Sequence, residues 1–566
     1  MTIKNSIKRG QGFDATSTWQ CHFYEASLND PDYLEVWCYT DQLSYEPGKT
    51  VNFHLSTTAK VISLAIYRDG GEQTLVHQHE VPGEFHETPD DYYEKGCGWP
   101  VGHRWQIPDD QPSGFYLVIC KVRNEKGEVQ EHEAGFFTRP VIGKPTADIL
   151  LIAATSTWRA YNDWGGTSNY YGHCEQYSMG KSPRLSIHKP WAKGFLYTPK
   201  GAPRRAYGYT THPGTIPRHP AFEFAFARGY SRCYASAGWA SYERHFAHWA
   251  EQQGYRMDYA TQTELHYHPE LLNQYPCVVM VGHDEYWSRE MRLAIDNYTE
   301  TGGHFARFGG NFIWQIRLED EGQTQVCYKD EAADKDPIVA EGKPHLLTSV
   351  WEDPTVGWKG AETVGLNGLC GQFAGNGHVA PRHNGGYTVY RPDSWVFKGT
   401  DLCYGDQFGS QAKIFGYEVD GLDYTIQYGL PEPTYRDGAI TGTQILAMGL
   451  AGNLEVDHGH KGSVLVHSSQ DIEGIAMCRY GETTPELIDA AGRGNGMIVL
   501  CPRGKGQIFN AGSCEWVAGL QRKDADTQIV TRNVLNQFTS KNSRENMCLP
   551  VGASLFTRLA EQVLHD

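Results

Sequence analysis

The first quarter of the chain alternates apolar and polar positions in short segments separated by Gly- and Pro-containing turns. Four of these segments are rich in β-branched and aromatic residues: Leu34–Tyr39, Thr50–Ser56, Val61–Tyr67 and Phe115–Lys121. This pattern predicts an all-β N-terminal domain over residues 15–140, of the β-sandwich class. Residues 136–140 are its predicted last strand, and residues 141–146 are the predicted linker to the next domain.

From Ala147 onward the pattern changes, because Ile149–Ala154 is a continuous apolar run of the kind found in parallel sheets. Apolar periodicity then predicts strands at 255–259 and 277–281 and helices at 221–227, 242–253, 269–275 and 529–538. Alternation of strands and helices predicts a doubly wound α/β domain over residues 146–540. Within it, 319–380 is expected to be loops, and 388–511 is expected to be β-rich, with a hairpin formed by 497–501 and 507–511.

Ionisable residues follow directly after the predicted strand Val278–Val281: His283, Asp284 and Glu285. A second predicted strand, reached through a helix that Ser288 can cap and Gly302-Gly303 can end, carries Asn311 at its C-terminal end. In open α/β sheets, ligands bind outside the carboxyl ends of the strands. The sequence therefore predicts that these four side chains lie on one rim.

Net charge and the length of apolar runs disfavour several classes of protein. The chain has 566 residues and a formal net charge of −17, which disfavours a nucleic-acid partner because such proteins need a basic face. We also expect no membrane span and no signal peptide, since no apolar run is long enough for either. The 14 cysteines lack any C-x-x-C spacing. Together these features predict a cytoplasmic protein with reduced thiols.

An aromatic loop follows the first strand of the α/β domain. Residues 155–172 are rich in Gly, Asn and aromatic side chains and include Tyr161, Tyr170 and Tyr171. At a strand's carboxyl end such a loop would line a pocket, although packed structural tyrosines are the commoner case. Phenolate and carboxylate oxygens are hard ligands, so Tyr161 together with Glu285 suits a hard cation such as Fe(III).

Other candidate sites have weaker support. The pairs His266/His268 and His458/His460 have i, i+2 spacing, but exposed loop histidines are the favoured interpretation. Glu418 taken alone is most simply a surface carboxylate. The chain has no zincin His-Glu-x-x-His, no serine-hydrolase Gly-x-Ser-x-Gly and no Walker A sequence, which removes three common enzyme classes.

Five motifs in a fixed order resemble the large (β) subunit family of N,N-dimethylformamidase. They are Trp-Arg-Ala-Tyr-Asn-Asp-Trp-Gly-Gly (158–166), Gly-His-Asp-Glu-Tyr-Trp-Ser (282–288), Phe-Gly-Gly-Asn (308–311), Gly-Tyr-Glu-Val-Asp (416–420) and Gly-Gln-Ile-Phe-Asn-Ala-Gly-Ser (506–513). The resemblance covers about residues 150–540, and a preceding β-sandwich also fits it. It implies an α/β domain similar to glutamine amidotransferases but without their cysteine nucleophile elbow.

The resemblance also implies chemistry, because the family hydrolyses small N-substituted amides at a mononuclear iron held by two tyrosines and a glutamate. It places the glutamate at Glu285 and the first tyrosine at Tyr161. It places the supporting histidine and asparagine at His283 and Asn311, and an acid/base glutamate at Glu418.

The second tyrosine ligand is not settled by the motifs. Residues 184–197 match the family poorly, and Trp191 occupies one aromatic position there. Tyr197 and Tyr207 both lie at a workable spacing, and we take Tyr197.

The resemblance implies that Fe(III) activates water to attack the amide carbonyl, with Glu418 or His283 moving the proton and Asn311 donating to the oxyanion. The implied partners are a small amide substrate, further copies of the chain in a homo-oligomer, and the family's small subunit. Two alternatives stay open at this point: a hydrolase of another C–N bond, such as a lactam or larger amide, and a metal-free binding protein that uses the same rim.

Overall fold

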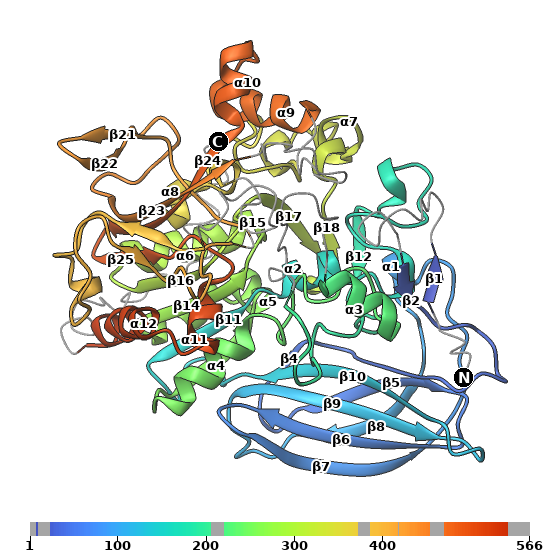
Figure 1. Ribbon diagram of the computed structural model, residues 1–566. Helices are drawn as coiled ribbons and strands as arrows, with labels where there is room; N and C mark the ends of the chain where they lie inside the picture. The colour runs from blue at the N-terminus through green and yellow to red at the C-terminus, as the bar shows by residue number, and fades with distance from the viewer. Residues whose placement is uncertain are drawn as a thin grey trace.

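A computed structural model describes residues 7–9, 23–204, 220–371, 385–416, 418–452 and 469–540. Within these residues the chain is a mixed α/β protein, with a β-rich N-terminal region beside a larger region built on a central sheet (Figure 1). Tyr207, His458 and His460 lie outside the described residues. No helix in the described part has the length and apolar character needed to cross a membrane.

The N-terminal region contains two sheets that share one hydrophobic cluster. The five-stranded sheet has the order β4 (Ser44–Tyr45), β10 (Val129–Thr138), β9 (Gly114–Arg123), β6 (Val61–Asp69), β7 (Gln73–Pro82). The three-stranded sheet has the order β3 (Val36–Thr40), β5 (Thr50–Thr57), β8 (Val101–Gln106). Alternate residues of β5 and β6 are buried in the shared cluster, as the alternating pattern requires. The predicted β-rich character is confirmed; the sandwich class and the boundaries 15–140 and 146–540 stay predictions.

The central sheet combines a parallel half with an antiparallel half. Its order is β13 (Met257–Thr261), β11 (Ile149–Ala153), β14 (Cys277–His283), β16 (His304–Gly310), β25 (Gly506–Asn510), β24 (Arg493–Arg503), β23 (Gln444–Gly452), β19 (Tyr387–Val389), β20 (Gln407–Phe408). The strands from β13 to β25 pair in parallel, and those from β25 to β20 pair antiparallel. The predicted 497–511 hairpin corresponds to β24 and β25.

Helices α2 (Thr155–Tyr161), α4 (Glu243–Gln252), α5 (Gln262–Tyr267) and α6 (Arg289–Glu300) lie in the connections between parallel strands. Helices α11 (Trp516–Gln521) and α12 (Ala525–Phe538) follow the last described strand, β25. Helix α6 begins as predicted, because the Ser288 hydroxyl accepts a hydrogen bond from the Met291 N–H at 3.2 Å. Helix α3 (Pro220–Arg228) also matches its prediction. Residues 269–274, by contrast, form a 3₁₀ helix rather than an α-helix.

Two helices interrupt the stretch that was expected to be β-rich: α9 (Ser469–Tyr480) and α10 (Pro485–Ala491). The prediction failed for α9 because its apolar residues do not gather on one face, so the sequence carries no helical periodicity. A start signal for α10 was present, since Thr484 caps the helix and Pro485 occupies its first turn.

The remaining strands form two small sheets. One has the order β12 (Arg184–Ser186), β18 (Thr324–Val326), β17 (Trp314–Glu319), β15 (Tyr286–Ser288). The other is the hairpin β21 (Tyr424–Gln427) with β22 (Leu430–Pro433). Between residues 319 and 371 the described chain is mostly irregular, with short helices α7 (Ala332–Lys335) and α8 (Ala361–Val364), in keeping with the predicted loop region.

The two regions pack directly against each other. Phe115 of β9 stacks on Trp239 with ring centroids 4.6 Å apart. The buried Asp69 carboxylate at the end of β6 accepts from Trp239 Nε1 at 2.7 Å and from Arg244 Nε at 2.7 Å. Apolar contact and a charge-assisted hydrogen bond therefore hold the N-terminal region to the central-sheet region.

A buried histidine, His132 of β10, also joins the regions. Its Nε2 donates to the Trp191 carbonyl at 2.9 Å, since a carbonyl can only accept, and its Nδ1 accepts from the Cys38 N–H at 3.3 Å. Burial lowers the pKa of His132 to about 3, so the ring is neutral at neutral pH.

Candidate active site

The carboxyl ends of the parallel strands meet at one rim of the central sheet. Helix α2 follows β11 and carries Tyr161 in its last turn. Strand β14 ends at His283, which pairs in register with Gly310 of β16, so the next residue, Asn311, lies beside it. Cys514 follows β25 on the far side of β16. The topology therefore brings side chains from four separate chain segments to one place.

Glycines at the strand ends allow this close approach. Gly282 has φ +76°, and a Cβ there would lie 2.2 Å from the Tyr242 Cβ. A Cβ on Gly310 would lie 2.8 Å from the Cys514 nitrogen and 2.9 Å from the Glu418 carbonyl oxygen. The glycines of the Phe-Gly-Gly-Asn motif thus leave room for the segment that carries Glu418.

His283 is the centre of the cluster. Its Nδ1 donates to the Ser236 carbonyl at 2.7 Å, which turns Nε2 toward two carboxylates. Nε2 lies 2.8 Å from Glu418 Oε2 and 3.2 Å from Glu285 Oε2. Burial alone would lower the pKa of His283, but the charges and hydrogen bonds of Glu418 and Glu285 outweigh it and raise that pKa to about 10.

Asn311 holds the cluster together from the other side. It is a non-glycine residue with φ +68°, a conformation that Asn tolerates better than most residues. Its backbone N–H donates to Asp420 Oδ1 at 2.6 Å, and its Nδ2 donates to Glu418 Oε2 at 2.5 Å. The same Nδ2 lies 3.0 Å from His283 Nε2, so the Asn311 amide lies against both Glu418 and His283.

Glu285 faces a group of aromatic donors. The Tyr170 hydroxyl donates to Glu285 Oε1 and Oε2, each at 3.0 Å, and Trp314 Nε1 donates to Oε1 at 2.8 Å. The Tyr161 ring lies 4.5 Å from the Tyr170 ring and 5.0 Å from the His283 ring. Burial would raise the pKa of Glu285, but hydrogen bonds from His283 and Tyr161 and nearby positive charge lower it.

Lys329 contacts this aromatic group and was not predicted as a site residue. The side chain is buried, with Nζ 3.1 Å from the Tyr286 hydroxyl and 3.4 Å from the centroid of the Tyr170 ring. Burial lowers the pKa of Lys329, and the Glu285 carboxylate opposes that shift. The residue lies in the polar stretch expected to be loops, where nothing separates a buried lysine from an exposed one.

A buried ion-pair network supports the rim from behind. Arg307 of β16 donates from Nε to Asp284 Oδ2 at 2.9 Å and from Nη1 to Asp420 Oδ2 at 2.6 Å. All three side chains are fully buried. Asp284, predicted as one of the rim's ionisable groups, therefore points to Arg307, while its neighbours His283 and Glu285 face each other.

A second set of metal-binding side chains lies in the same cluster. Ligand atoms of His283, Glu418 and Cys514 all lie within 4.8 Å of one another, and all three residues are buried. Burial, with the Glu418 charge, raises the pKa of the Cys514 thiol well above its usual value, and a protonated thiol is a weak ligand. Hard oxygen donors from Tyr161, Tyr170 and Glu285 are the alternative set.

The structure does not bring Tyr197 to this cluster. Its side chain is 44% exposed and lines a separate hollow with Arg204 and Tyr234. Among the described residues, no contact joins Tyr197 to Tyr161 or Glu285. The second phenol at Glu285, beside Tyr161, is that of Tyr170, nine residues later in the aromatic loop.

The pair His266 and His268 does not converge. His266 belongs to helix α5, not to a loop, and its Nδ1 lies 2.7 Å from the Ser288 hydroxyl. His268 lies at the surface beside Glu270, with Nδ1 3.3 Å from Oε1.

Comparison with known proteins agrees with these motifs. A family model described as "N,N-dimethylformamidase beta subunit-like, C-terminal" matches residues 60–528. The N,N-dimethylformamidase beta subunit of Alcaligenes sp is 25% identical over 508 residues, and that of Paracoccus aminophilus is 23% identical over 534 residues. Each alignment covers 83% of this chain and 58% of the relative, so the chain spans less than two thirds of either relative's length. The chain belongs to the N,N-dimethylformamidase beta subunit-like, C-terminal family.

Proposed function

We propose that this chain hydrolyses small N-substituted amides with the help of a mononuclear Fe(III). One observation carries the proposal: the Glu285 carboxylate lies among the phenols of Tyr161 and Tyr170, next to the hydrogen-bonded pair His283 and Glu418. Hard oxygen donors on one side and a proton-transfer pair on the other are what a metal-assisted hydrolase requires. The two relatives' names, which state dimethylformamidase, point to the same reaction class.

In this proposal Tyr161, Tyr170 and Glu285 hold the ion. When bound, Fe(III) acts as a Lewis acid toward an amide carbonyl and toward water. Without a cation, burial and the Glu285 charge raise the pKa of Tyr170 well above its usual value. A trivalent charge reverses that balance and favours the phenolate. Tyr170 takes the second-tyrosine position for which the sequence suggested Tyr197.

Proton transfer falls to Glu418 and His283. Glu418 Oε2 lies 2.8 Å from His283 Nε2 and accepts from Asn311 Nδ2, so its lone pairs are directed by two partners. We assign Glu418 as the group that takes a proton from water and returns it to the leaving amine. His283 holds that carboxylate in place, and Asn311 is also placed to donate to the developing oxyanion.

Iron content and substrate range test the proposal. Purified protein should contain about one iron per chain and show visible phenolate-to-Fe(III) absorption, because a phenolate bound to a hard ferric ion gives a charge-transfer band. A panel of formamides, acetamides and lactams should show turnover of the small linear amides. A colourless protein that stays metal-free after growth with iron would instead indicate a binding protein, and preferred turnover of lactams would indicate another C–N hydrolase.

The choice of Tyr170 has its own test. Tyr170→Phe removes the hydroxyl that lies 3.0 Å from both Glu285 oxygens, so visible absorption should weaken and iron content should fall. Tyr197→Phe is the matched control and should leave both unchanged, because Tyr197 lies at a separate surface hollow. The reverse pattern would return the second ligand to Tyr197.

Assembly is the last element of the proposal. Both relatives are named as beta subunits. We therefore propose that this chain also associates, either with further copies of itself or with a smaller subunit. Light scattering on the purified chain would give its mass in solution, and a monomer that is fully active alone would contradict this element.

A further inference from the structure

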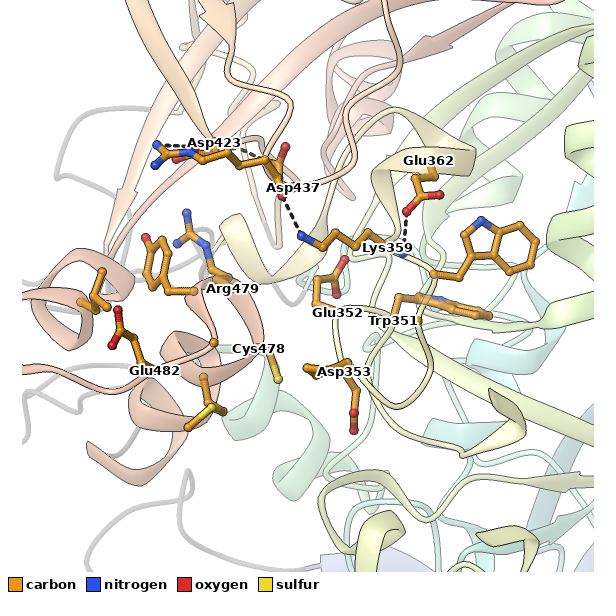
Figure 2. Close-up of a pocket in the computed structure, with 18 residues that line it drawn as sticks. Trp351, Glu352, Asp353, Lys359, Glu362, Asp423, Asp437, Cys478, Arg479 and Glu482 are labelled. Atoms are coloured by element: carbon orange, nitrogen blue, oxygen red, sulfur yellow. Dashed lines mark hydrogen bonds and ion pairs between the residues drawn. The ribbon is translucent and has the colours of Figure 1, made fainter. Parts of the chain in front are cut away.

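A hollow of about 670 Å³ is lined by residues other than those of the rim cluster. Three parts of the chain line it: residues 351–362, the two ends of the β21–β22 hairpin with Asp423 and Asp437, and residues 477–487 from the end of α9 into α10 (Figure 2). Its volume is within the range of ordinary small-molecule sites.

Three charged side chains that line this hollow each have a buried polar atom without a hydrogen-bond partner among the described residues: Glu352 Oε2, Asp437 Oδ1 and Arg479 Nη1. Each comes from a different segment, and Figure 2 shows the three side chains around one space. The Glu352 side chain is only 5% exposed, and its other oxygen accepts from the Gly360 N–H at 3.1 Å. Unpaired buried polar atoms are uncommon in native proteins, so three in one hollow need an explanation.

The hollow's two other cations, Arg436 and Lys359, already have partners. Arg436 Nη2 lies 2.9 Å from Asp423 Oδ2, and Lys359 Nζ donates to the Arg436 carbonyl at 2.7 Å. The aromatic faces are partly taken as well, because the Arg292 guanidinium lies 3.9 Å from the Trp358 ring centroid. A ligand would therefore meet its polar partners at Glu352, Asp437 and Arg479.

Electrostatics agree with this geometry. Burial raises the pKa of Glu352 to about 7 and also raises the pKa of Asp437. Burial would lower the pKa of Arg479, but nearby acidic groups, Asp437 among them, outweigh it. The hollow thus presents one guanidinium that needs an acceptor and two carboxyl groups that need donors.

We propose that this hollow binds a small zwitterion, a molecule that carries an ammonium and a carboxylate, as an amino acid does. The carboxylate would accept from Arg479, and the ammonium would donate to Glu352 and Asp437. An amine alone would leave the guanidinium unpaired, and a carboxylate alone would leave both acids unpaired. Met477 and Tyr480, which also line the hollow, would contact the carbon chain between the two charged ends.

This site is separate from the rim, and its test does not depend on iron or on amide hydrolysis. The link between them is indirect: Trp351, next to Glu352, stacks on Phe312 with ring centroids 5.8 Å apart, and Phe312 follows Asn311 in the chain. Binding can therefore be measured on the full-length protein whether or not it shows activity.

Calorimetric titration with glycine, β-alanine and 4-aminobutyrate tests the proposal, with methylamine and acetate as one-ended controls. At least one zwitterion should bind with one site per chain and about tenfold or more tightly than either control, because a charged hydrogen bond is lost at one end. Glu352→Gln and Arg479→Gln should each weaken that binding about tenfold or more. Glu482→Gln, on the same lining, is the matched control and should change nothing.

Other outcomes would overturn the proposal. Methylamine binding as tightly as every zwitterion would make the hollow a cation site, and acetate doing so would make it an anion site. No heat from any zwitterion, or full binding by both the Glu352→Gln and Arg479→Gln proteins, would remove the site altogether. Thermal unfolding of each variant establishes that a loss of binding is not a loss of fold.

Discussion

Glu285 at the rim and Glu352 in the hollow are equally buried, with 3% and 5% of their surface exposed, yet their pKa values shift in opposite directions. Partners explain the difference. Hydrogen bonds and charge from His283 and Tyr161 overcome burial and lower the pKa of Glu285. For Glu352, burial outweighs the Gly360 N–H donor and the more distant charge of Arg292, and it raises the pKa to about 7. The depth of a carboxylate therefore says less about its charge than the groups that face it.

The largest effects should follow when the rim's two carboxylates are changed separately. Glu418→Gln should reduce the proposed hydrolysis by roughly 10²–10⁴-fold with iron retained, because it removes the acid/base group. Glu285→Gln should lose the proposed iron along with activity, because it removes the charge of a proposed ligand. Metal analysis beside single-turnover rates distinguishes them. Near-normal turnover by Glu418→Gln with full iron would transfer the proton role to His283.

Removing Arg307 should leave the carboxylates behind the rim buried without a paired cation, as Glu352 is in the hollow. Arg307→Met leaves Asp284 and Asp420 buried without their cation, so the free energy of unfolding should fall by about 3–5 kcal/mol. Urea unfolding followed by circular dichroism gives the value. Arg307→Lys keeps the charge but cannot reach both carboxylates with the same geometry. Its free energy of unfolding should therefore lie between those of the parent and the Arg307→Met variant. A loss below about 1 kcal/mol for the Met variant would mean that the network does not support the rim.

A buried histidine with satisfied partners should respond to acid. The pKa of His132 is about 3 in the fold and 6.5 when exposed, so below pH 6.5 the unfolded state binds more protons. The free energy of unfolding should therefore fall as the pH falls toward 3, by about 2 kcal/mol between pH 6.5 and 5 from this residue.

His132→Gln provides the control for that prediction, because an amide can also donate to Trp191 and accept from Cys38 but does not titrate in this range. Urea unfolding at pH 7 and at pH 5 should show a smaller difference for the variant than for the parent. Equal differences would exclude His132 as the acid-sensitive group.

The smallest expected effect comes from Glu352, and its pH dependence is opposite to that of His132. The pKa of Glu352 is about 7 in the fold against 4.5 when exposed, so the contribution of this residue to stability is fully present below pH 4.5 and is lost as the pH rises toward 7. Glu352→Gln removes that penalty and should stabilise the protein by about 1–2 kcal/mol at pH 8. Thermal melts at pH 8 and pH 5 measure it. A destabilised variant at pH 8 would mean that the carboxylate has a partner there.

The sequence predicted most of the rim's placement, because strand ends are marked by a change from apolar to polar residues. His283, Glu285 and Asn311 each follow a buried run that becomes β14 or β16. Glu418 carries no such mark, since it lies in an irregular segment, and only the family resemblance placed it near the others. The N-cap Ser288 could also be predicted, because the residues that begin a helix follow a local sequence pattern.

Other members of the site could not be predicted from the sequence. Tyr170 and Lys329 lie in segments without periodicity, and their contacts join residues 115 or 43 positions apart. Arg307 lies inside an apolar strand, where only the three-dimensional position of Asp284 and Asp420 explains a buried charge. Long-range pairing of this kind leaves no trace in local composition.

The alternation of roles along two short segments has a consequence for redesign. In His283-Asp284-Glu285 the outer residues contact each other within the proposed site, while the middle one is bound to Arg307. In 418–420 the glutamate faces His283, and the aspartate two positions later is tied to the same arginine. Chemistry and scaffold thus occupy different positions of the same few residues. A library that varies positions 283, 285 and 418 but keeps Asp284, Arg307 and Asp420 should yield mostly folded proteins. A library that varies positions 284, 307 and 420 instead should yield mostly unfolded ones.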